Sequence, residues 1–277
     1  MSPENLPSIF TTEMLCRIGG PVPDAKAASR RAHAGVLAEH LPALMQRFEI
    51  DRPLRMAHFT GQMAHESDSF CTMEEYASGA AYEGRADLGN LHVGDGKRFK
   101  GRGPFQLTGR GNYRAFTSWM REYVSADAPD FEGRPELVLA DRWVAYSPIY
   151  FWITRGLNRH ADRDDILAVT RIINGGRNGL EDRKVKLGRA KAEIAKAMAS
   201  ATLDTGRDEW PILHRGLMDD KGVERLQYWL AKAGYTLAID GDFGPATELA
   251  LKDWQRRKGL PPTGIANGAT WVMLTGD

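Results

Sequence analysis

Two glutamates in this chain, Glu66 and Glu75, could supply the acid and the base of a glycosidase. Such enzymes generally use one carboxylic acid to protonate the leaving oxygen and one carboxylate to activate water or to attack the anomeric carbon. Inversion at that carbon needs about 6.5 to 9.5 Å between the two carboxyl groups, and retention needs about 5 Å. Glu74 and Glu83 compete for the second role.

The spacing of the two glutamates requires a break in the helix that carries the first. On an unbroken helix, positions 66 and 75 would be rotated by about 900° and separated by about 13.5 Å, on opposite faces. Ser67, Asp68 and Ser69 are weak helix formers that compete for backbone hydrogen bonds. We therefore expect a helix that ends near Glu66 and a chain that carries Glu75 across a cleft.

Other polar residues could hold an acetamido sugar in the same cleft. Gln106 and Thr108 lie in the run GRGPFQLT, and Asn174 lies in INGG. For Gln106 and Asn174, capping of a backbone turn is the alternative role. The pair His65-Glu66 does not indicate a zinc protease, because HExxH requires histidine where Ser69 stands.

No cofactor is expected from the remaining motifs. Basic residues between 97 and 110 accompany glycines that lack the Walker spacing of a nucleotide site. Cys16 and Cys71 are too few for a disulfide framework and have no zinc-ligand spacing. We expect neither a metal ion nor an organic cofactor.

The composition is that of an ordinary globular protein. The 277 residues leave room for two domains, and 42% of them are hydrophobic and 26% charged, with a formal net charge of +1. Nucleic acid is therefore not the expected partner. The first residues lack the basic and apolar runs of a signal peptide or a membrane span, so we expect the chain to stay in the cytoplasm where it is made, without membrane insertion.

The elements that must position these residues are mainly helices. Apolar residues recur at steps of three and four, and a two-residue alternation is nearly absent. A helix is expected to begin after Asp51, with Pro53 in its first turn, and to run to Glu66. Residues 78–103 are rich in Gly, Asp and Asn and predict a long irregular segment. Further helices are expected over residues 28–48, 113–124, 140–154, 164–173, 179–198, 222–233 and 247–257.

The helical periodicity lapses between Ser200 and Pro211, which predicts a domain boundary. We expect a first domain over residues 1–204 and a compact second one over residues 213–277. In the second, Tyr228, Tyr235 and Trp271 could stack on sugar or peptide, or could fill the core.

The first domain resembles glycoside hydrolase family 19, the chitinase-like family, and specifically its short phage and bacterial endolysin branch. The resemblance covers about residues 28–197, and the residues that carry it are Ala64-His65-Glu66-Ser67, Glu75, Phe99 to Thr108, Asn112-Tyr113 and Ile172 to Gly176. It implies a lysozyme-like, α-helical catalytic domain.

The resemblance also implies roles for individual residues. The proton donor of the family matches Glu66 and its general base matches Glu75, with Thr108 helping to hold the attacking water. Positions that contact sugar match Gln106, Tyr113 and Asn174 together with Thr108. Three more residues, His65, Arg102 and Arg183, would set the charge of the carboxylates from beside the cleft.

The second domain resembles the three-helix type of peptidoglycan-binding domain. Its signature here is Asp240-Gly241-Asp242-Phe243-Gly244-Pro245-Ala246-Thr247, with Trp254-Gln255 and Thr263-Gly264 following. The two aspartates could suggest a calcium loop, but the further acidic ligands of an EF-hand are absent.

Together the two resemblances imply an endolysin-type peptidoglycan hydrolase. It would cleave the β-1,4 bond of the MurNAc-GlcNAc glycan with inversion, would act as a monomer on bacterial peptidoglycan, and would reach the wall through a holin-type membrane hole made by another protein. A chitinase and a non-catalytic wall-binding lectin are the alternatives. The joint presence of Glu66, Glu75 and the sugar-contacting positions argues against a lectin, which needs no acid/base pair.

Overall fold

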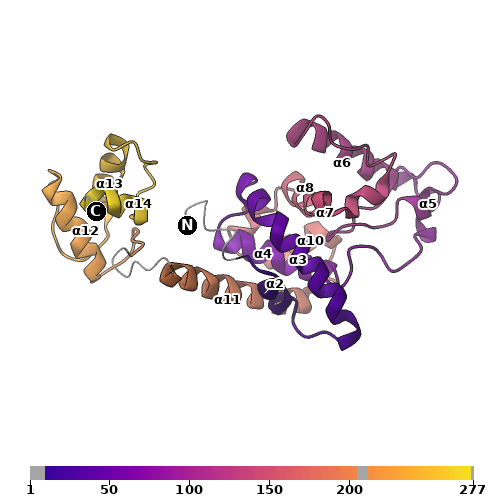
Figure 1. The fold of residues 1–277 in the computed structure, drawn as a ribbon, viewed down its shortest axis with the longest axis horizontal. Helices are drawn as coiled ribbons and strands as arrows, with labels where there is room; N and C mark the ends of the chain where they lie inside the picture. Colours follow the sequence, from indigo (N-terminus) through magenta and orange to yellow (C-terminus); the bar gives the residue numbers. More distant parts are fainter. Residues whose placement is uncertain (1–9, 205–210, 276–277) are drawn as a thin grey trace. The chain divides into compact units, whose positions relative to one another are not determined.

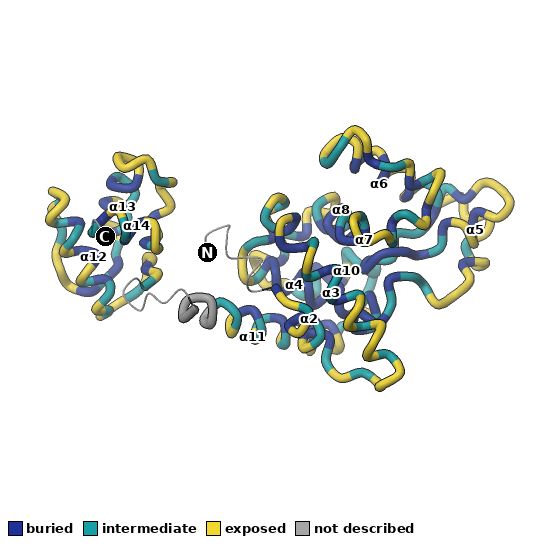
Figure 2. Tube along the Cα trace, in the orientation of Figure 1, coloured by how far each residue is buried: buried dark blue, intermediate teal, exposed yellow. Residues whose placement is uncertain are grey.

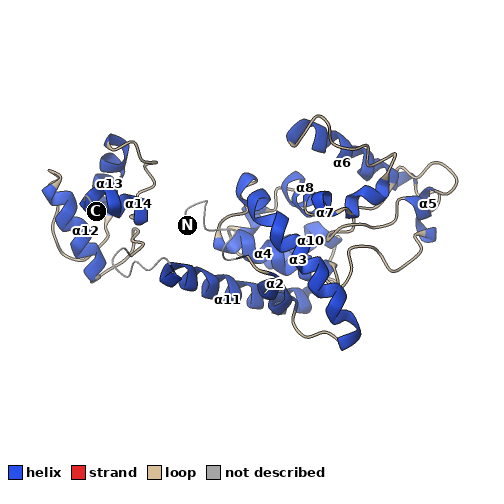
Figure 3. Cartoon of the chain, in the orientation of Figure 1, coloured by secondary structure: helices blue, strands red, loops and turns tan. Residues whose placement is uncertain are grey.

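The computed structural model describes residues 10–204 and 211–275. Every regular element in these ranges is a helix, and extended residues form only isolated bridges (Figure 3). The prediction of a mainly α-helical fold is confirmed. The chain divides into two compact units, Met1–Ala201 and Thr202–Asp277. Half of the predicted boundary segment, residues 205–210, lies outside the described residues.

The first unit contains α-helices linked by irregular segments and 3₁₀ turns (Figure 1). The α-helices are α2 (Thr12–Gly19), α3 (Asp24–Arg47), α4 (Pro53–Glu66), α5 (Asp95–Arg98), α6 (Arg110–Tyr123), α7 (Asp141–Val144), α8 (Tyr146–Thr154), α9 (Asn158–Ala161), α10 (Ile166–Asn174) and α11 (Leu180–Asp204). The 3₁₀ turns are η2 (Ala80–Tyr82), η3 (Ala86–Leu88) and η4 (Pro135–Leu139). Among the described helices, none is both long and apolar enough to cross a bilayer.

Helix α4 lies at the centre of the first unit. All of its residues from Arg55 to Ala64 are buried, and the helix contacts α2, α9 and α10 (Figure 2). A Cβ added at Gly61 would lie 3.1 Å from the backbone of Leu187, so this glycine lets α11 approach α4 closely. That approach brings the first turns of α11 beside the C-terminal half of α4.

The two ends of α4 follow from local sequence. Pro53 occupies its first turn, where the missing N–H would have no helical partner. After Glu66 the chain enters a left-handed turn of three non-glycine residues, Asp68, Ser69 and Phe70, with φ of 51°, 61° and 67°. Each such residue costs about 1–2 kcal/mol. The predicted helix break after Glu66 is confirmed.

Side chains and tertiary contacts hold this left-handed turn. The hydroxyl of Ser67 accepts a 3.0 Å hydrogen bond from the backbone N–H of Phe70 and donates to the carbonyl of Met63. Ser69 donates from its hydroxyl to the carbonyl of Gly19, at 3.0 Å. The turn redirects the chain so that residues 73–75 run beside residues 101–103.

A small antiparallel bridge fixes the orientation of the next residues. The N–H of Glu75 donates to the carbonyl of Gly101 at 2.9 Å, and that of Gly103 donates to Met73 at 2.7 Å. Arg102 exchanges backbone hydrogen bonds with Leu107 on its other side. Because neighbouring side chains of an extended segment point to opposite faces, Glu74 and Glu75 must face different sides.

The irregular segment predicted over residues 78–103 is ordered by buried ion pairs. Asp95, only 1% exposed, accepts two hydrogen bonds from Arg110 at the start of α6, at 2.9 and 2.5 Å. Arg110 also donates to Glu132 at 3.1 Å. The carboxylate of Glu83 accepts hydrogen bonds from the backbone N–H groups of Gly94 and Gly96. The segment therefore has a fixed shape, although it contains little regular helix.

The second unit contains α12 (Lys221–Lys232), α13 (Pro245–Arg257) and α14 (Gly268–Thr275) around its own apolar core. Gln227, 1% exposed, accepts from the N–H groups of Asp240 and Gly241 and donates to the carbonyl of Asp242. This side chain therefore fixes the Asp-Gly-Asp turn before α13. Of the three aromatic candidates, Trp271 is fully buried in the core and Tyr228 is 43% exposed.

Candidate active site

A cleft of about 580 Å³ in the first unit collects the two candidate carboxylates. Glu66 reaches it from the end of α4, and Glu75 reaches it from the extended segment beyond the left-handed turn. The other residues that line it are His65, Asp68, Thr72, Tyr76, Tyr82, Gln106, Thr108, Asp182 and Lys186. The fold thus brings together most of the residues that the sequence analysis selected.

Glu66 is paired with a buried arginine that follows it by 117 residues. Nη2 of Arg183, on α11, donates to Oε1 of Glu66, and the arginine side chain is only 2% exposed while that of Glu66 is 21% exposed. The same guanidinium donates through Nη1 to Oε1 of Gln62 and through Nε to the carbonyl of Asn178. Arg183 therefore lies beside a carboxylate of the cleft.

Glu75 is held by two hydrogen-bond donors. The Tyr82 hydroxyl donates to Oε1 at 2.8 Å, and the N–H of Gly101 donates to Oε2 at 3.2 Å. Burial, together with the bond to Glu75, raises the pKa of Tyr82, so the hydroxyl keeps its proton as a donor. Each oxygen of Glu75 thus accepts one bond, which fixes the direction of the carboxylate in the cleft.

The competing glutamates have other partners. Glu74 forms ion pairs with Arg102 at 3.0 Å and Lys100 at 3.4 Å, and it lines a different cavity of about 290 Å³. Glu83 ties down backbone N–H groups within its own loop. Neither lines the cleft, so the geometry selects Glu75 as the partner of Glu66.

Gln106 and Thr108 enter the cleft from a tight turn. Gln106 has a left-handed backbone, with φ of 52°, and its N–H donates to the carbonyl of Gly103 at 3.0 Å. Its Oε1 is buried and has no hydrogen-bond partner, whereas Nε2 donates to Gly103 at 3.3 Å. Strained backbone and unsatisfied polar atoms gather at functional sites. The amide oxygen is thus left without a partner in a residue that lines the cleft.

Thr108 is oriented by the same turn. Its hydroxyl donates to the carbonyl of Gln106 at 2.8 Å, which leaves the lone pairs of Oγ1 to accept a hydrogen bond from another group. A water in the cleft could donate to this oxygen. The arrangement suits the predicted role of Thr108 in holding an attacking water.

Two groups of hydrogen-bonded polar side chains form further parts of the cleft. His65 Nδ1 contacts Asp182 at 2.6 Å, and Lys186 donates to the same carboxylate at 2.8 Å. Burial alone would raise the pKa of Asp182, but the bonds from Lys186 and His65 outweigh it and lower the pKa. The other group contains Tyr76, 71% exposed, whose hydroxyl donates to Asp68 at 2.9 Å.

The structure corrects two of the predicted positions. Tyr113 is fully buried and does not line the cleft, because its hydroxyl donates to the carbonyl of Lys100 and accepts from Arg102. Burial raises its pKa to about 12. Arg102 pairs with Glu74 rather than with Glu66 or Glu75. Both residues support the segment that carries Glu75 and cannot contact sugar from these positions.

Asn174 also lies outside the cleft-lining residues and acts in a turn. Its Nδ2 donates to the carbonyl of Asn178 at 2.7 Å, and its Oδ1 accepts from the N–H of Gly176 at 2.9 Å. The capping alternative therefore describes this residue. The same carbonyl of Asn178 accepts from Arg183, so Asn174 is connected to Glu66 through one arginine.

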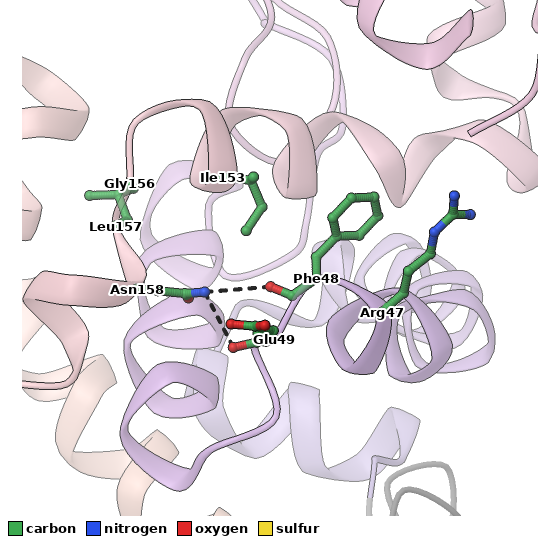
Figure 4. Close-up of a pocket in the computed structure, with 7 residues that line it drawn as sticks. All are labelled: Arg47, Phe48, Glu49, Ile153, Gly156, Leu157 and Asn158. Carbon is green, nitrogen blue, oxygen red and sulfur yellow. Dashed lines mark hydrogen bonds between the residues drawn. The ribbon is translucent and has the colours of Figure 1, made fainter. Parts of the chain in front are cut away.

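A further cavity, of about 370 Å³, lies between the end of α3 and the connection from α8 to α9 (Figure 4). Asn158 donates from Nδ2 to the carbonyls of Phe48 and Glu49, at 3.4 and 3.2 Å, and its Oδ1 accepts from Trp152. Because all polar atoms of this amide are used, Asn158 joins α9 to the turn between α3 and α4.

Sequence reasoning missed several cleft residues, of which Tyr82 is the most informative. It lies in η2, inside the segment predicted as irregular, and nothing in its spacing links it to Glu75. The length of that segment was the sequence feature that could have pointed to Tyr82, because long ordered loops are usually functional. Asp182 and Lys186 were missed because ion pairs made across a fold leave no local sequence pattern.

Comparisons with known proteins agree with both resemblances. Residues 219–274 match the family described as "Putative peptidoglycan binding domain". The chain is 33% identical over 109 residues to a glycosyl hydrolase family 19 domain-containing protein of Haemophilus influenzae, covering 39% of this chain and 49% of that protein. It is 29% identical over 147 residues to acidic endochitinase Q of Nicotiana tabacum, covering 45% and 52%.

A further match is to a zinc D-Ala-D-Ala carboxypeptidase of Streptomyces albus G, 36% identical over 85 residues, or 28% of this chain and 33% of that protein. The chain thus spans about half the length of the first two relatives. Over part of its length the chain is therefore similar to chitinase-like proteins of glycoside hydrolase family 19, and its residues 219–274 match a peptidoglycan-binding domain.

Proposed function

We propose that this protein is an endolysin-type hydrolase that cleaves the β-1,4 glycosidic bond of the MurNAc-GlcNAc glycan of bacterial peptidoglycan. The observation that carries the proposal is that Glu66 and Glu75 reach one cleft from opposite sides of a left-handed turn, in a chain that also has a peptidoglycan-binding domain. Its release to the wall through a membrane hole made by another protein is part of the proposal.

The proposed mechanism is a single displacement. Glu66 gives its proton to the glycosidic oxygen while the bond from that oxygen to the anomeric carbon breaks. Glu75 takes a proton from the water that attacks the same carbon from the other face, and Thr108 Oγ1 accepts a hydrogen bond from the second hydrogen of that water, which stays on the oxygen that joins the carbon. A β-linked substrate then yields an α-anomer at first, which ¹H NMR of the fresh product can detect. A β-anomer would contradict the displacement by water.

The two bonded oxygens of Glu75 support this assignment. Each oxygen accepts one hydrogen bond, and because burial raises the pKa of Tyr82, its hydroxyl keeps the proton that it donates. Glu66 is fixed by Arg183, which limits the rotamers from which its proton can be given. Positioned acid–base groups of this kind are typically worth about 10² to 10⁴ in rate.

The deciding experiment is mass spectrometry of borohydride-reduced fragments from purified murein digested by the protein, beside a Glu66→Gln control. New reduced MurNAc ends that vanish in the control support a muramidase. Reduced GlcNAc ends would make the enzyme a glucosaminidase. Anhydro-MurNAc or free stem peptides would contradict the two-carboxylate hydrolysis.

A chitinase is the second candidate, because two matched relatives are named as chitinases, from Nicotiana tabacum and Oryza sativa. Digestion of chitin oligosaccharides in parallel with murein distinguishes it: turnover of the oligosaccharides without release from murein supports the chitinase. Absence of turnover on both substrates would instead favour a wall-binding lectin.

A further inference from the structure

Arg183 makes three directed contacts from a buried position. Its Nη2 donates to Glu66, its Nη1 donates to Gln62, and its Nε donates to the carbonyl of Asn178. The arginine is 2% exposed and Gln62 is 1% exposed. A guanidinium can only donate, in a rigid planar fork. Its orientation is therefore set by the acceptors that surround it.

Two of those acceptors come from one face of α4. Gln62 and Glu66 are four residues apart, so their side chains lie one helical turn from each other. They receive the two terminal nitrogens of the same guanidinium. Gln62 thereby fixes the rotation of the fork that points Nη2 at Glu66. Gly61, next to it, allows α11 to approach closely enough for this contact.

The observed orientation of the Gln62 amide leaves one of its polar groups unsatisfied. Its Nε2 is buried and has no hydrogen-bond partner. Turning the amide over would place this donor against the Arg183 donor and leave both without an acceptor. An apolar residue would avoid the buried unsatisfied nitrogen, which normally lowers stability. Among the described residues, Arg183 is the hydrogen-bond partner of this side chain, so the benefit must lie in that contact.

We propose that Gln62 is a positioning residue for the acid of this site: as a neutral acceptor it orients Arg183 toward Glu66 without competing for the charge of the guanidinium. The inference rests on the proposed function of Glu66 as proton donor. A carboxylate at position 62 would form a second ion pair with the same arginine. A neutral amide fixes the orientation and leaves the positive charge to Glu66 alone.

Other charged or titratable groups share the cleft with Glu66, and each has its own partner. His65 and Lys186 contact Asp182, whereas Glu75 accepts from Tyr82. On the remaining side Asp68 accepts from Tyr76 and Lys26. Arg183 forms the ion pair with Glu66, so a change at Gln62 acts on Glu66 through that arginine.

Two substitutions in the full-length protein separate charge from orientation. Gln62→Glu keeps an acceptor but adds a negative charge that shares Arg183, so protonated Glu66 persists to higher pH. We expect the alkaline limb of the pH profile of kcat to rise by about 1 pH unit. Gln62→Met removes the acceptor without adding charge. It should lower kcat about tenfold, leave KM nearly unchanged and produce no upward movement of that limb.

The matched control is His58→Gln, a buried polar position one turn earlier on α4 that contacts Asp164 instead of Arg183. It should keep the wild-type kcat and pH profile, whatever its effect on thermal stability. If all three variants lose activity only in proportion to their folded fraction, Gln62 has a structural role and the inference is wrong.

A readout without turnover keeps this test separate from that of the proposed function. In ¹³C-labelled protein, the chemical shift of the Glu66 carboxyl carbon reports its protonation directly. Its titration midpoint should rise in Gln62→Glu, relative to wild type, even if neither murein nor chitin is cleaved. An unchanged midpoint would overturn the inference, whereas an inactive wild-type protein with a shifted midpoint would overturn the proposed reaction only.

Discussion

Tyr82 donates a 2.8 Å hydrogen bond to Oε1 of Glu75, and so connects the irregular segment to the candidate base. Removing the hydroxyl leaves this carboxylate with the single N–H of Gly101. A hydrogen bond to a charged group contributes about 1.5–3 kcal/mol. Tyr82→Phe should therefore lower kcat by about tenfold to a hundredfold on murein fragments.

Tyr123→Phe, at the exposed end of α6, is the matched control and should retain full activity. Equal turnover by the two variants would mean that Tyr82 does not orient the base.

The neighbouring glutamates should differ sharply when each is replaced by glutamine. Glu75→Gln removes the candidate base and should reduce kcat by about 10² to 10⁴. Glu74→Gln breaks ion pairs with Arg102 and Lys100 outside the cleft, so it should affect thermal stability more than turnover. Circular dichroism melting and initial rates measure the two effects. A larger loss of rate in Glu74→Gln would reverse the assignment.

The ion pairs that anchor residues 78–99 predict acid sensitivity. Hydrogen bonds from Arg110 hold the pKa of Asp95 well below its usual range, and Arg114 and Arg110 lower that of Glu132 to about 2. Depressed pKa values contribute stability that is present above the unfolded values, near pH 4, and is lost as the pH falls toward 2. Asp95→Asn should cost about 3 kcal/mol at pH 7 and less at pH 2.

Urea unfolding at several pH values measures this contribution. Asp87→Asn, which breaks an exposed pair with Arg85, is the control and should leave the unfolding free energy nearly unchanged. If the unfolding free energy of Asp95→Asn fell with pH as steeply as that of the wild type, the ion pair of Asp95 with Arg110 would not be the cause of the acid sensitivity.

Removal of the second unit should separate lysis from catalysis. Each unit has its own apolar core, so a chain ending near Thr205 should keep the cleft intact. A tether raises the effective concentration of the catalytic unit at an insoluble wall and can increase apparent affinity by about 10² to 10⁴. We expect a large loss of activity on intact walls and little loss on soluble oligosaccharides. Equal losses on both substrates would contradict this division of roles.

Local sequence was a good guide wherever a contact is made within a few residues. The end of α4 was predicted from Ser67 and its neighbours, because weak helix formers bond to nearby backbone, and the hydroxyl of Ser67 does so in the structure. The short helices α2 and α14 were missed, since eight residues carry too little periodicity to be recognised. Tyr113 was misplaced because the sequence does not distinguish an aromatic that contacts sugar from one that supports a loop.

The sequence by itself determined the order of the motifs, the helical content of the chain and the signature motifs of both units. These features depend on residue type and spacing alone. Only the tertiary structure decided that Glu75, and not Glu74, shares a cleft with Glu66, because this choice depends on which face of residues 73–75 turns inward. It also decided the partner of Glu66. Arg183 is 117 residues away, and its contact with Gln62 and Glu66 exists only because Gly61 lets α11 pack closely on α4.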